Sequence, residues 1–216
     1  MSTLQIDIVS DVVCPWCFIG KRQLERALAK LHVERSDIVP RIRWLPYFLN
    51  PDTPVEGEPY RPFLERKFGG PEKLAQLQAH VAEAGRTAGI DFAFEQIEVR
   101  ANTLRAHRLI HHVQKTGDAG ELVERLFAAH FLNGEDIGDI NLLARLAGEC
   151  GQDASAVQAY LCSDEDAAAV RAQAERGQRM GISGVPFFIF NGRHGVGGAQ
   201  PPEILLDAMR LSLMTH

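Results

Sequence analysis

The sequence predicts an α/β protein whose sheet is formed by the two ends of the chain, with a block of helices inserted between them. Apolar and β-branched strand patterns occur near both ends of the chain. In contrast, apolar residues recur at helical spacing through most of residues 71–181. A chain of 216 residues suits one domain with a sizeable insertion. We therefore expect a sheet domain formed by residues 1–60 and 182–216, interrupted by a helical insertion at residues 61–181.

The N-terminal part predicts a strand, a helix and a second strand. The apolar run of residues 4–13 stops at Cys14. Pro15 suits the first turn of a helix, because its missing N–H needs no partner there. The apolar stripe of this helix consists of Cys17, Leu24, Leu28 and Leu31. Residues 40–49 predict a second strand, and residues 50–62, which hold four prolines, predict a loop.

The middle of the chain predicts several helices, and its end predicts a hairpin followed by a last helix. Four apolar stripes at helical spacing are formed by Leu74, Leu77 and Val81, by Ala106, Leu109, Ile110 and Val113, by Val123, Leu126, Phe127 and Phe131, and by Leu143, Leu146, Ala147 and Cys150. Ser163, followed by three acidic residues, predicts a helix N-cap. The dipeptide Asn191–Gly192 predicts the turn of a hairpin between residues 185–190 and 193–198. A final helix is expected from Pro201 onward.

The overall composition limits the class of partner. Hydrophobic residues make up 45% and charged residues 24% of the chain, which is typical of a globular protein. A net charge of −5 leaves no basic excess for a nucleic-acid partner. No apolar run approaches the roughly 18 residues of a membrane span, and "MSTLQIDIVS" lacks the features of a secretory signal. We therefore expect a cytoplasmic protein without a membrane partner, whose thiols stay reduced.

Four cysteines raise the choice between a metal site and a redox site. Cys14 and Cys17 form a C-x-x-C motif within "VVCPWCFIG". A zinc site of the two-plus-two kind needs a second close pair, and Cys150 and Cys162, twelve residues apart, do not supply one. We therefore expect no metal. We interpret Cys150 and Cys162 as packing residues on helix faces, with a second redox pair as the alternative.

The C-x-x-C motif is better explained by thiol chemistry. A thiolate attacks disulfides, and the unpaired N–H groups at a helix N-terminus stabilise a negative charge. Cys14 is expected at that position. Cys17, one turn further along, is expected to be shielded and to resolve a mixed disulfide formed at Cys14. The uncharged Pro15 and Trp16 lie between the thiols, where the intervening residues tune the stabilisation of the thiolate, so Pro15 is expected to support the active site. Trp16 is expected to stand partly exposed as an apolar contact for an unfolded substrate.

Four segments together resemble a known family. They are "SDVVCPWCFIGKRQLERAL" (10–28), "ANTLRAHRLI" (101–110), "GISGVPFFIF" (181–190) and "GGAQPPEIL" (197–205). This ordered set resembles the DsbA-like family of the thioredoxin superfamily, in particular its FrnE-like branch. The resemblance implies a thioredoxin-like fold with a large all-helical insertion, and the activity of a protein-disulfide oxidoreductase or isomerase.

The resemblance also implies roles for residues outside the motif. It implies a cis Val185–Pro186 bond beside the dithiol, with the Val185 backbone pairing with an extended substrate; from the residues alone, Pro186 would be a trans proline that opens a strand. Kappa-class glutathione transferases and 2-hydroxychromene-2-carboxylate isomerases share this fold and bind glutathione, but a serine stands there where Cys14 stands here. We therefore expect no tightly bound cofactor, with glutathione as a candidate redox co-substrate.

Several polar residues near these segments have two interpretations each. Asp11 supports the site if it relays a proton to or from Cys17, although an exposed aspartate at a loop end is the interpretation that we favour. Asn102 and His107 are candidates for substrate binding if they face a cleft beside the dithiol. For Asn102 the residues alone favour a helix N-cap. His107 and His111, four residues apart, could bind a metal together, but ordinary packing or surface histidines are favoured.

Three hypotheses about function follow. The first is a cytoplasmic thiol–disulfide oxidoreductase or isomerase that acts on disulfide-containing or unfolded proteins through Cys14, Cys17 and Pro186. The second is a glutathione-dependent isomerase or transferase of the same fold. The third is a non-catalytic binder of unfolded chains that uses the dithiol as a sensor. We favour the first because of the C-x-x-C motif at a helix start. The direction of electron flow and the choice between monomer and homodimer stay open.

Overall fold

The sheet of this protein is formed by both ends of the chain, as the sequence predicts. The structure, a computed structural model, describes residues 2–214. The sheet has four strands in the order β2-β1-β5-β6. These are β1 (Ser2–Ser10), β2 (Ile38–Pro46), β5 (Phe187–Phe190) and β6 (His194–Gly197). β2 lies parallel to β1, whereas β5 pairs antiparallel with both β1 and β6. This confirms the predicted α/β class.

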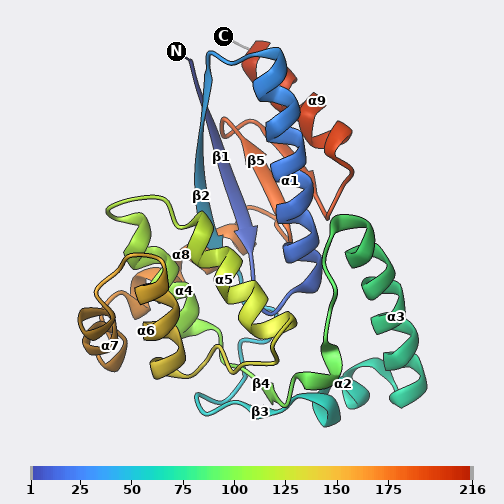
Figure 1. Cartoon of the computed structure of the whole chain (residues 1–216), viewed down its shortest axis with the longest axis vertical. Helices are drawn as coiled ribbons and strands as arrows, with labels where there is room; N and C mark the ends of the chain where they lie inside the picture. Colours follow the sequence, from blue (N-terminus) through green and yellow to red (C-terminus); the bar gives the residue numbers. More distant parts are fainter. Residues whose placement is uncertain (1, 215–216) are drawn as a thin grey trace.

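Three helices cover this sheet. α1 (Pro15–Glu34) and α9 (Pro202–Met214) pack against each other on one face, and α8 (Ala167–Arg179) packs on β2. Figure 1 shows α1 and α9 side by side and α8 close to the lower end of β2. The central strand β1 is buried almost throughout, as expected for a strand with helices on both sides. α8 therefore belongs to the layers of the sheet domain, although it lies within the predicted insertion.

The remaining helices form the block predicted from the apolar stripes. They are α2 (Tyr60–Phe68), α3 (Pro71–Ala88), α4 (Leu104–Gln114), α5 (Gly120–Phe131), α6 (Ile140–Glu149) and α7 (Ala154–Cys162). The predicted stripe residues are buried, except for Leu77, which is exposed, and Cys150, which is half-buried. A two-stranded sheet of β3 (Glu58–Pro59) and β4 (Val99–Arg100), with the short helix η1 (Phe94–Gln96), joins the block to the loop after β2. None of the helices within residues 2–214 is long and apolar enough to cross a bilayer.

A side chain from α4 holds the helical block against the edge of the sheet. The Gln114 side chain accepts a hydrogen bond from the Trp44 N–H at 2.6 Å and donates one to the Trp44 carbonyl at 3.1 Å. This contact satisfies backbone groups of β2 that would otherwise be unpaired at the sheet edge. Two helical turns before Gln114, on the same side of α4, lies His107. The contact therefore directs His107 toward the end of β1.

Local boundaries differ from the prediction at several places. β2 spans Ile38–Pro46 instead of residues 40–49, and the predicted loop 50–62 contains β3 and the start of α2. β1 ends at Ser10, because residues 11–14 form a turn that leads into α1. Ser163 does not begin a helix: it ends α7, and both its N–H and its hydroxyl donate to the Tyr160 carbonyl. The residue before α8 is Asp166, which has a positive φ of 61°. The predicted hairpin is confirmed, with Asn191 and its neighbouring glycine at φ values of 50° and 66°.

Candidate redox site

Cys14 lies at the N-terminus of α1, as predicted. The Cys14 N–H donates to the Asp11 carbonyl at 3.0 Å, which closes the turn after β1, and the Cys14 carbonyl accepts from the Cys17 N–H at 3.0 Å. Cys14 is the N-cap residue of α1, and no side chain accepts a hydrogen bond from the first turn. Its sulfur therefore lies at the positive end of a 20-residue helix. Cys14 is a free thiol and is only 4% exposed, so little of its side chain is accessible from solvent.

Cys17 is the more deeply buried thiol of the pair. It is free and 1% exposed. Burial raises the pKa of Cys17 well above its ordinary value, and the hydrogen bond to Cys14 and the charge of Cys14 raise it further. The Ser10 hydroxyl and the Asp11 backbone act in the opposite direction but do not outweigh burial. Cys17 therefore holds its proton beyond neutral pH, and its ionisation needs help from a base.

Pro186 lies directly beside the dithiol. The Val185–Pro186 peptide bond is cis, as the resemblance implies. The Cys14 thiol donates to the Val185 carbonyl at 3.7 Å. A Cβ atom on Gly20 would come within 2.8 Å of Pro186 Cγ, so α1 approaches Pro186 closely only because Gly20 has no side chain. Among the described residues, the Val185 N–H has no acceptor, and its pairing with a substrate backbone stays a prediction.

Asp11 is buried, and the favoured prediction of an exposed aspartate is wrong. Its side chain is 1% exposed. One carboxylate oxygen accepts from the Leu49 N–H at 2.9 Å, and the other lies 3.2 Å from His107 Nε2. A buried carboxylate needs such partners because desolvation is costly. The predicted role of Asp11 as active-site support stays a prediction, and the contact with His107 gives it a geometric basis.

The two predicted substrate-binding residues of α4 take different positions. His107 is 5% exposed, and its ring contacts Phe48 edge-on at a centroid distance of 5.3 Å. It therefore does not face an open cleft, which corrects the expected orientation. Asn102 accepts from the Leu104 N–H at 3.0 Å and donates to the Thr53 carbonyl at 2.7 Å. Asn102 thus contacts the start of α4 but is not its N-cap as the residues alone favoured, because the N-cap residue is Thr103. Substrate contact by either residue stays a prediction.

The residues between the thiols lie at the rim of the site. Pro15 occupies the first position of α1, and both Pro15 and Trp16 are partly exposed. The Trp16 ring lies 5.7 Å from the His80 ring of α3, so the tryptophan bridges α1 and the helical block. This placement agrees with the predicted partial exposure of Trp16. Its contact with a substrate stays a prediction.

The other two cysteines lie apart from each other. Cys162 lines a cavity together with Ile140, at the start of α6, whereas Cys150 directly follows the end of α6. Ten helical residues span about 15 Å, well beyond the reach of a disulfide. Cys150 and Cys162 therefore do not form a second redox pair. Cys162 is exposed, so its interpretation as a packing residue is wrong.

Two buried polar residues near the site were not predicted. Ser10 is 5% exposed and acts on Cys17, and its position as the last residue of a strand, four before Cys14, was the available signal. His130 of α5 is 1% exposed, and its charge interacts with that of Asp11. No local pattern indicated this burial, because His130 is polar and falls outside the predicted apolar stripe. Residues 2–214 contain no group of three or more His, Cys, Asp or Glu side chains that could hold a metal ion.

The strand order, the C-x-x-C dithiol at the start of α1 and the cis proline beside it together define a thioredoxin-like protein with a dithiol. The family model of the DSBA-like thioredoxin domain matches residues 5–210. This chain therefore belongs to the DsbA-like thioredoxin family.

Individual relatives support this assignment. The chain is 28% identical over 159 residues to the uncharacterized protein YwbO of Bacillus subtilis. These residues cover 74% of this chain and 72% of YwbO. The crystal structure of the probable DsbA oxidoreductase SCO1869 from Streptomyces coelicolor has a TM-score of 0.88 and 27% identity, covering 99% of this chain and 91% of the other. The cytosolic disulfide reductase DsbM from Pseudomonas aeruginosa, solved with GSH, has a TM-score of 0.66 and 19% identity over 98% of both chains. The last similarity shows the shared fold.

Proposed function

We propose that this protein is a thiol–disulfide oxidoreductase that reduces or isomerises disulfides of protein substrates in the cytoplasm. The observation that carries the proposal is the arrangement of two free thiols, in which Cys14 lies at the N-terminus of α1 with Cys17 buried behind it. The contact between the Cys14 sulfur and the Val185 carbonyl supports our proposal that an extended substrate pairs with the Val185 backbone.

The proposed reaction transfers two electrons from the dithiol to the substrate. The Cys14 thiolate attacks one sulfur of the substrate disulfide, which forms a mixed disulfide and releases the other substrate sulfur as a thiolate. Cys17 then loses its proton and attacks the Cys14 sulfur. This second step forms the Cys14–Cys17 disulfide and releases the second substrate thiolate. Two molecules of a thiol such as glutathione regenerate the dithiol: the first forms a mixed disulfide with one cysteine, and the second attacks that mixed disulfide and leaves as oxidised glutathione.

The direction of the reaction is part of the proposal. In a reducing cytosol the dithiol is the resting form, which favours reduction or isomerisation over oxidation. The name of the DsbM relative, a cytosolic disulfide reductase, agrees with this direction.

Turbidimetric insulin reduction with glutathione as the electron donor tests the proposal. Cys14→Ser should reduce the rate to that of glutathione alone, because serine cannot form the mixed disulfide. Cys162→Ser is the matched control, since it removes an exposed thiol remote from the dithiol and should leave the rate unchanged. Equal rates for Cys14→Ser and the parent protein would refute the proposed function.

A second candidate is a glutathione-dependent isomerase or transferase. A cavity of about 570 Å³ is lined by Arg66, Lys67 and Arg100, whose cations suit the carboxylates of glutathione. Glu58 of the same cavity pairs with Arg100 at 2.7 Å and with Arg66 at 3.6 Å, so a glutathione carboxylate would compete with Glu58 for these two arginines. Leu49 lines the same cavity and donates its N–H to Asp11, which places the cavity next to the dithiol loop. Calorimetry with glutathione and the reduced Cys17→Ala variant tests this candidate. Absence of measurable heat at millimolar glutathione would exclude it.

A further inference from the structure

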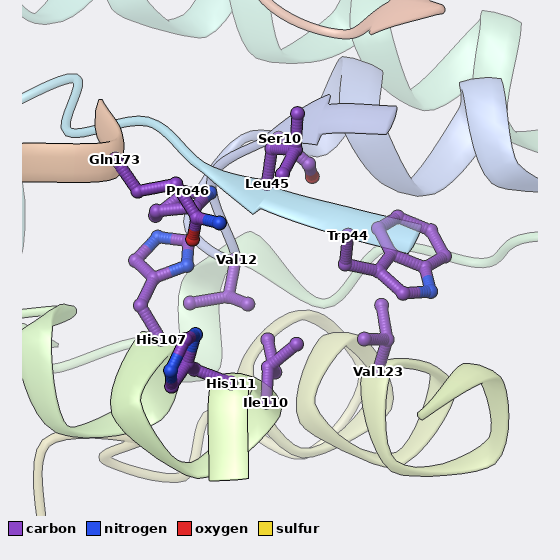
Figure 2. A pocket seen from close by; sticks show the side chains of 10 residues that line it. All are labelled: Ser10, Val12, Trp44, Leu45, Pro46, His107, Ile110, His111, Val123 and Gln173. Atoms are coloured by element: carbon purple, nitrogen blue, oxygen red, sulfur yellow. The ribbon is translucent and has the colours of Figure 1, made fainter. Parts of the chain in front are cut away.

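A small internal cavity lies between the end of β1 and helix α4. It leaves about 10 Å³ for the centre of a water molecule, which is roughly the room that one buried water needs. Figure 2 shows that its lining comes from separate elements, with Ser10 from β1, His107 from α4 and Gln173 from α8. The Gln173 amide points toward the His107 ring in this view. The cavity therefore has the size and the polar groups of a site for one water molecule.

The Ser10 hydroxyl connects this cavity to the dithiol. Ser10 Oγ is buried and has no hydrogen-bond partner of ordinary geometry in the described residues. It nevertheless lies close enough to the Cys17 sulfur to lower the pKa of Cys17. A buried hydroxyl without a partner is costly, and a bound water would satisfy it. Ser10 thus lines the cavity and also acts on Cys17.

On the other side of the cavity, His107 is oriented by a buried carboxylate. When His107 Nε2–H donates to Asp11 at 3.2 Å, Nδ1 is left as a proton acceptor. Asp11 also stabilises the imidazolium that forms if Nδ1 takes a proton. Asp11 is held in place by the Leu49 N–H at 2.9 Å. This is the arrangement of a general base with its orienting partner.

We propose that His107, oriented by Asp11, is the general base that deprotonates Cys17 through Ser10 and one water bound in this cavity. In the resolving step, the Cys17 proton moves to the Ser10 oxygen as the Ser10 proton moves to the water, and a water proton moves to His107 Nδ1. Cys17 is left as a thiolate that attacks the Cys14 sulfur of the mixed disulfide, and His107 carries the positive charge. This inference rests on the proposed function, because it concerns the second of its two steps.

Other charged groups surround the proposed base. His111 of α4 lines the same cavity, but its Nε2 lies 3.9 Å from Asp166. Lys67 of α2 and His130 of α5 interact electrostatically with Asp11. Within the described residues, none of these side chains forms a hydrogen bond or a ring contact with His107. Of these side chains, His111 shares the cavity without contacting Asp11, so it provides the control position.

The reaction with 5,5′-dithiobis(2-nitrobenzoate) separates the two steps in stopped flow. The experiment uses full-length reduced protein in a Cys150→Ala, Cys162→Ser background. Attack by Cys14 releases the first equivalent of coloured thiolate, and attack by Cys17 releases the second. For His107→Gln, we expect the second release to slow by about 10²-fold at pH 7, a typical contribution of a general base. Its rate should then rise about tenfold per pH unit, because it depends only on spontaneous ionisation of Cys17. The first release should change less than threefold.

Further variants keep the test decisive. In His107→Gln, the glutamine can still donate a hydrogen bond to Asp11. In Asp11→Asn, the asparagine can still accept a hydrogen bond from the Leu49 N–H, and this variant should slow the second release as much as His107→Gln does. One folded variant of the two is enough for the test. Ser10→Ala should slow it too, whereas His111→Gln should match the parent protein. Second-release rates within threefold of the parent for His107→Gln and Asp11→Asn across pH 6–9 would overturn the inference. Absence of a second release in the parent protein would instead overturn the proposed function.

Discussion

His130 makes the stability of this protein depend on pH in a defined direction. Its ring lies in the core, 4.7 Å from the Phe131 ring and 6.2 Å from the Tyr60 ring, and neither ring nitrogen has a hydrogen-bond partner of ordinary geometry. Burial lowers the pKa of His130 from 6.5 to about 4, and the nearby Glu135 backbone and Asp11 only partly oppose this. The folded state therefore holds His130 neutral where the unfolded state binds a proton.

The size of the effect follows from this difference in pKa. Between pH 6.5 and pH 4 the unfolded chain binds more protons at His130, so the free energy of unfolding falls as the pH falls. The stabilisation is fully present above pH 6.5, and a difference of this size corresponds to a loss of about 2.5 kcal/mol between pH 7 and pH 4.5. Carboxylates titrate in the same range, so the measurement needs a variant for comparison.

Urea unfolding followed by circular dichroism at pH 7 and pH 4.5 provides this comparison. His130→Phe keeps an aromatic ring and cannot be protonated, so it should lose about 2.5 kcal/mol less than the parent protein over this interval. His32→Gln, at an exposed position of α1, is the control and should follow the parent. The reasoning is refuted if His130→Phe and the parent lose the same stability within about 0.5 kcal/mol, a resolution that urea titrations allow.

Two further predictions concern packing around the site. Gly20→Ala places a methyl group 2.8 Å from Pro186 Cγ, which should destabilise the protein by about 1–3 kcal/mol in urea titration and lower the rate of insulin reduction; an unchanged rate and stability would contradict the close approach. Arg108 is 3% exposed, and its guanidinium donates to the backbone carbonyls of Tyr160, Leu161 and Glu165. Arg108→Met removes these three hydrogen bonds. It should cost about 3 kcal/mol in urea titration, because these carbonyls lose their donors, whereas a cost below about 1 kcal/mol would mean that water replaces the guanidinium.

Local patterns in the sequence predicted most of the fold. Strand alternation, helical periodicity and the Asn191–Gly192 turn each depend on neighbours within about seven residues, and these elements form as expected. The positions that differ depend on contacts between distant segments. α8 covers the sheet although it belongs by sequence to the helical block, and β3 pairs with β4 across some 40 residues of chain. No local pattern records such a pairing.

The candidate site could likewise be predicted only where its features depend on residues close together in the sequence. Cys14, Cys17 and Pro186 were found because two thiols at a helix start are a local feature and the family resemblance supplied the proline. The burial of Asp11 was missed because its partner His107 lies 96 residues away in the sequence. An aspartate one residue beyond a buried strand looks solvated until a helix from elsewhere covers it. A buried carboxylate requires a hydrogen-bond or charge partner, and here that partner comes from a segment distant in the sequence, which local patterns do not reveal.

The helical block therefore contributes more than a cover for the sheet. Through Gln114, α4 is attached to the edge strand β2, and the same helix carries His107 to Asp11. Without the block, Asp11 would lose its buried partner, and the wall that His107 adds to the cavity beside Ser10 would be missing. The sheet domain supplies the two thiols and the cis proline, which suffice for attack on a disulfide. The block adds a buried base behind the second thiol, the group that needs one because burial keeps Cys17 protonated. The rate of the resolving step should therefore depend on how firmly α4 is held against β2.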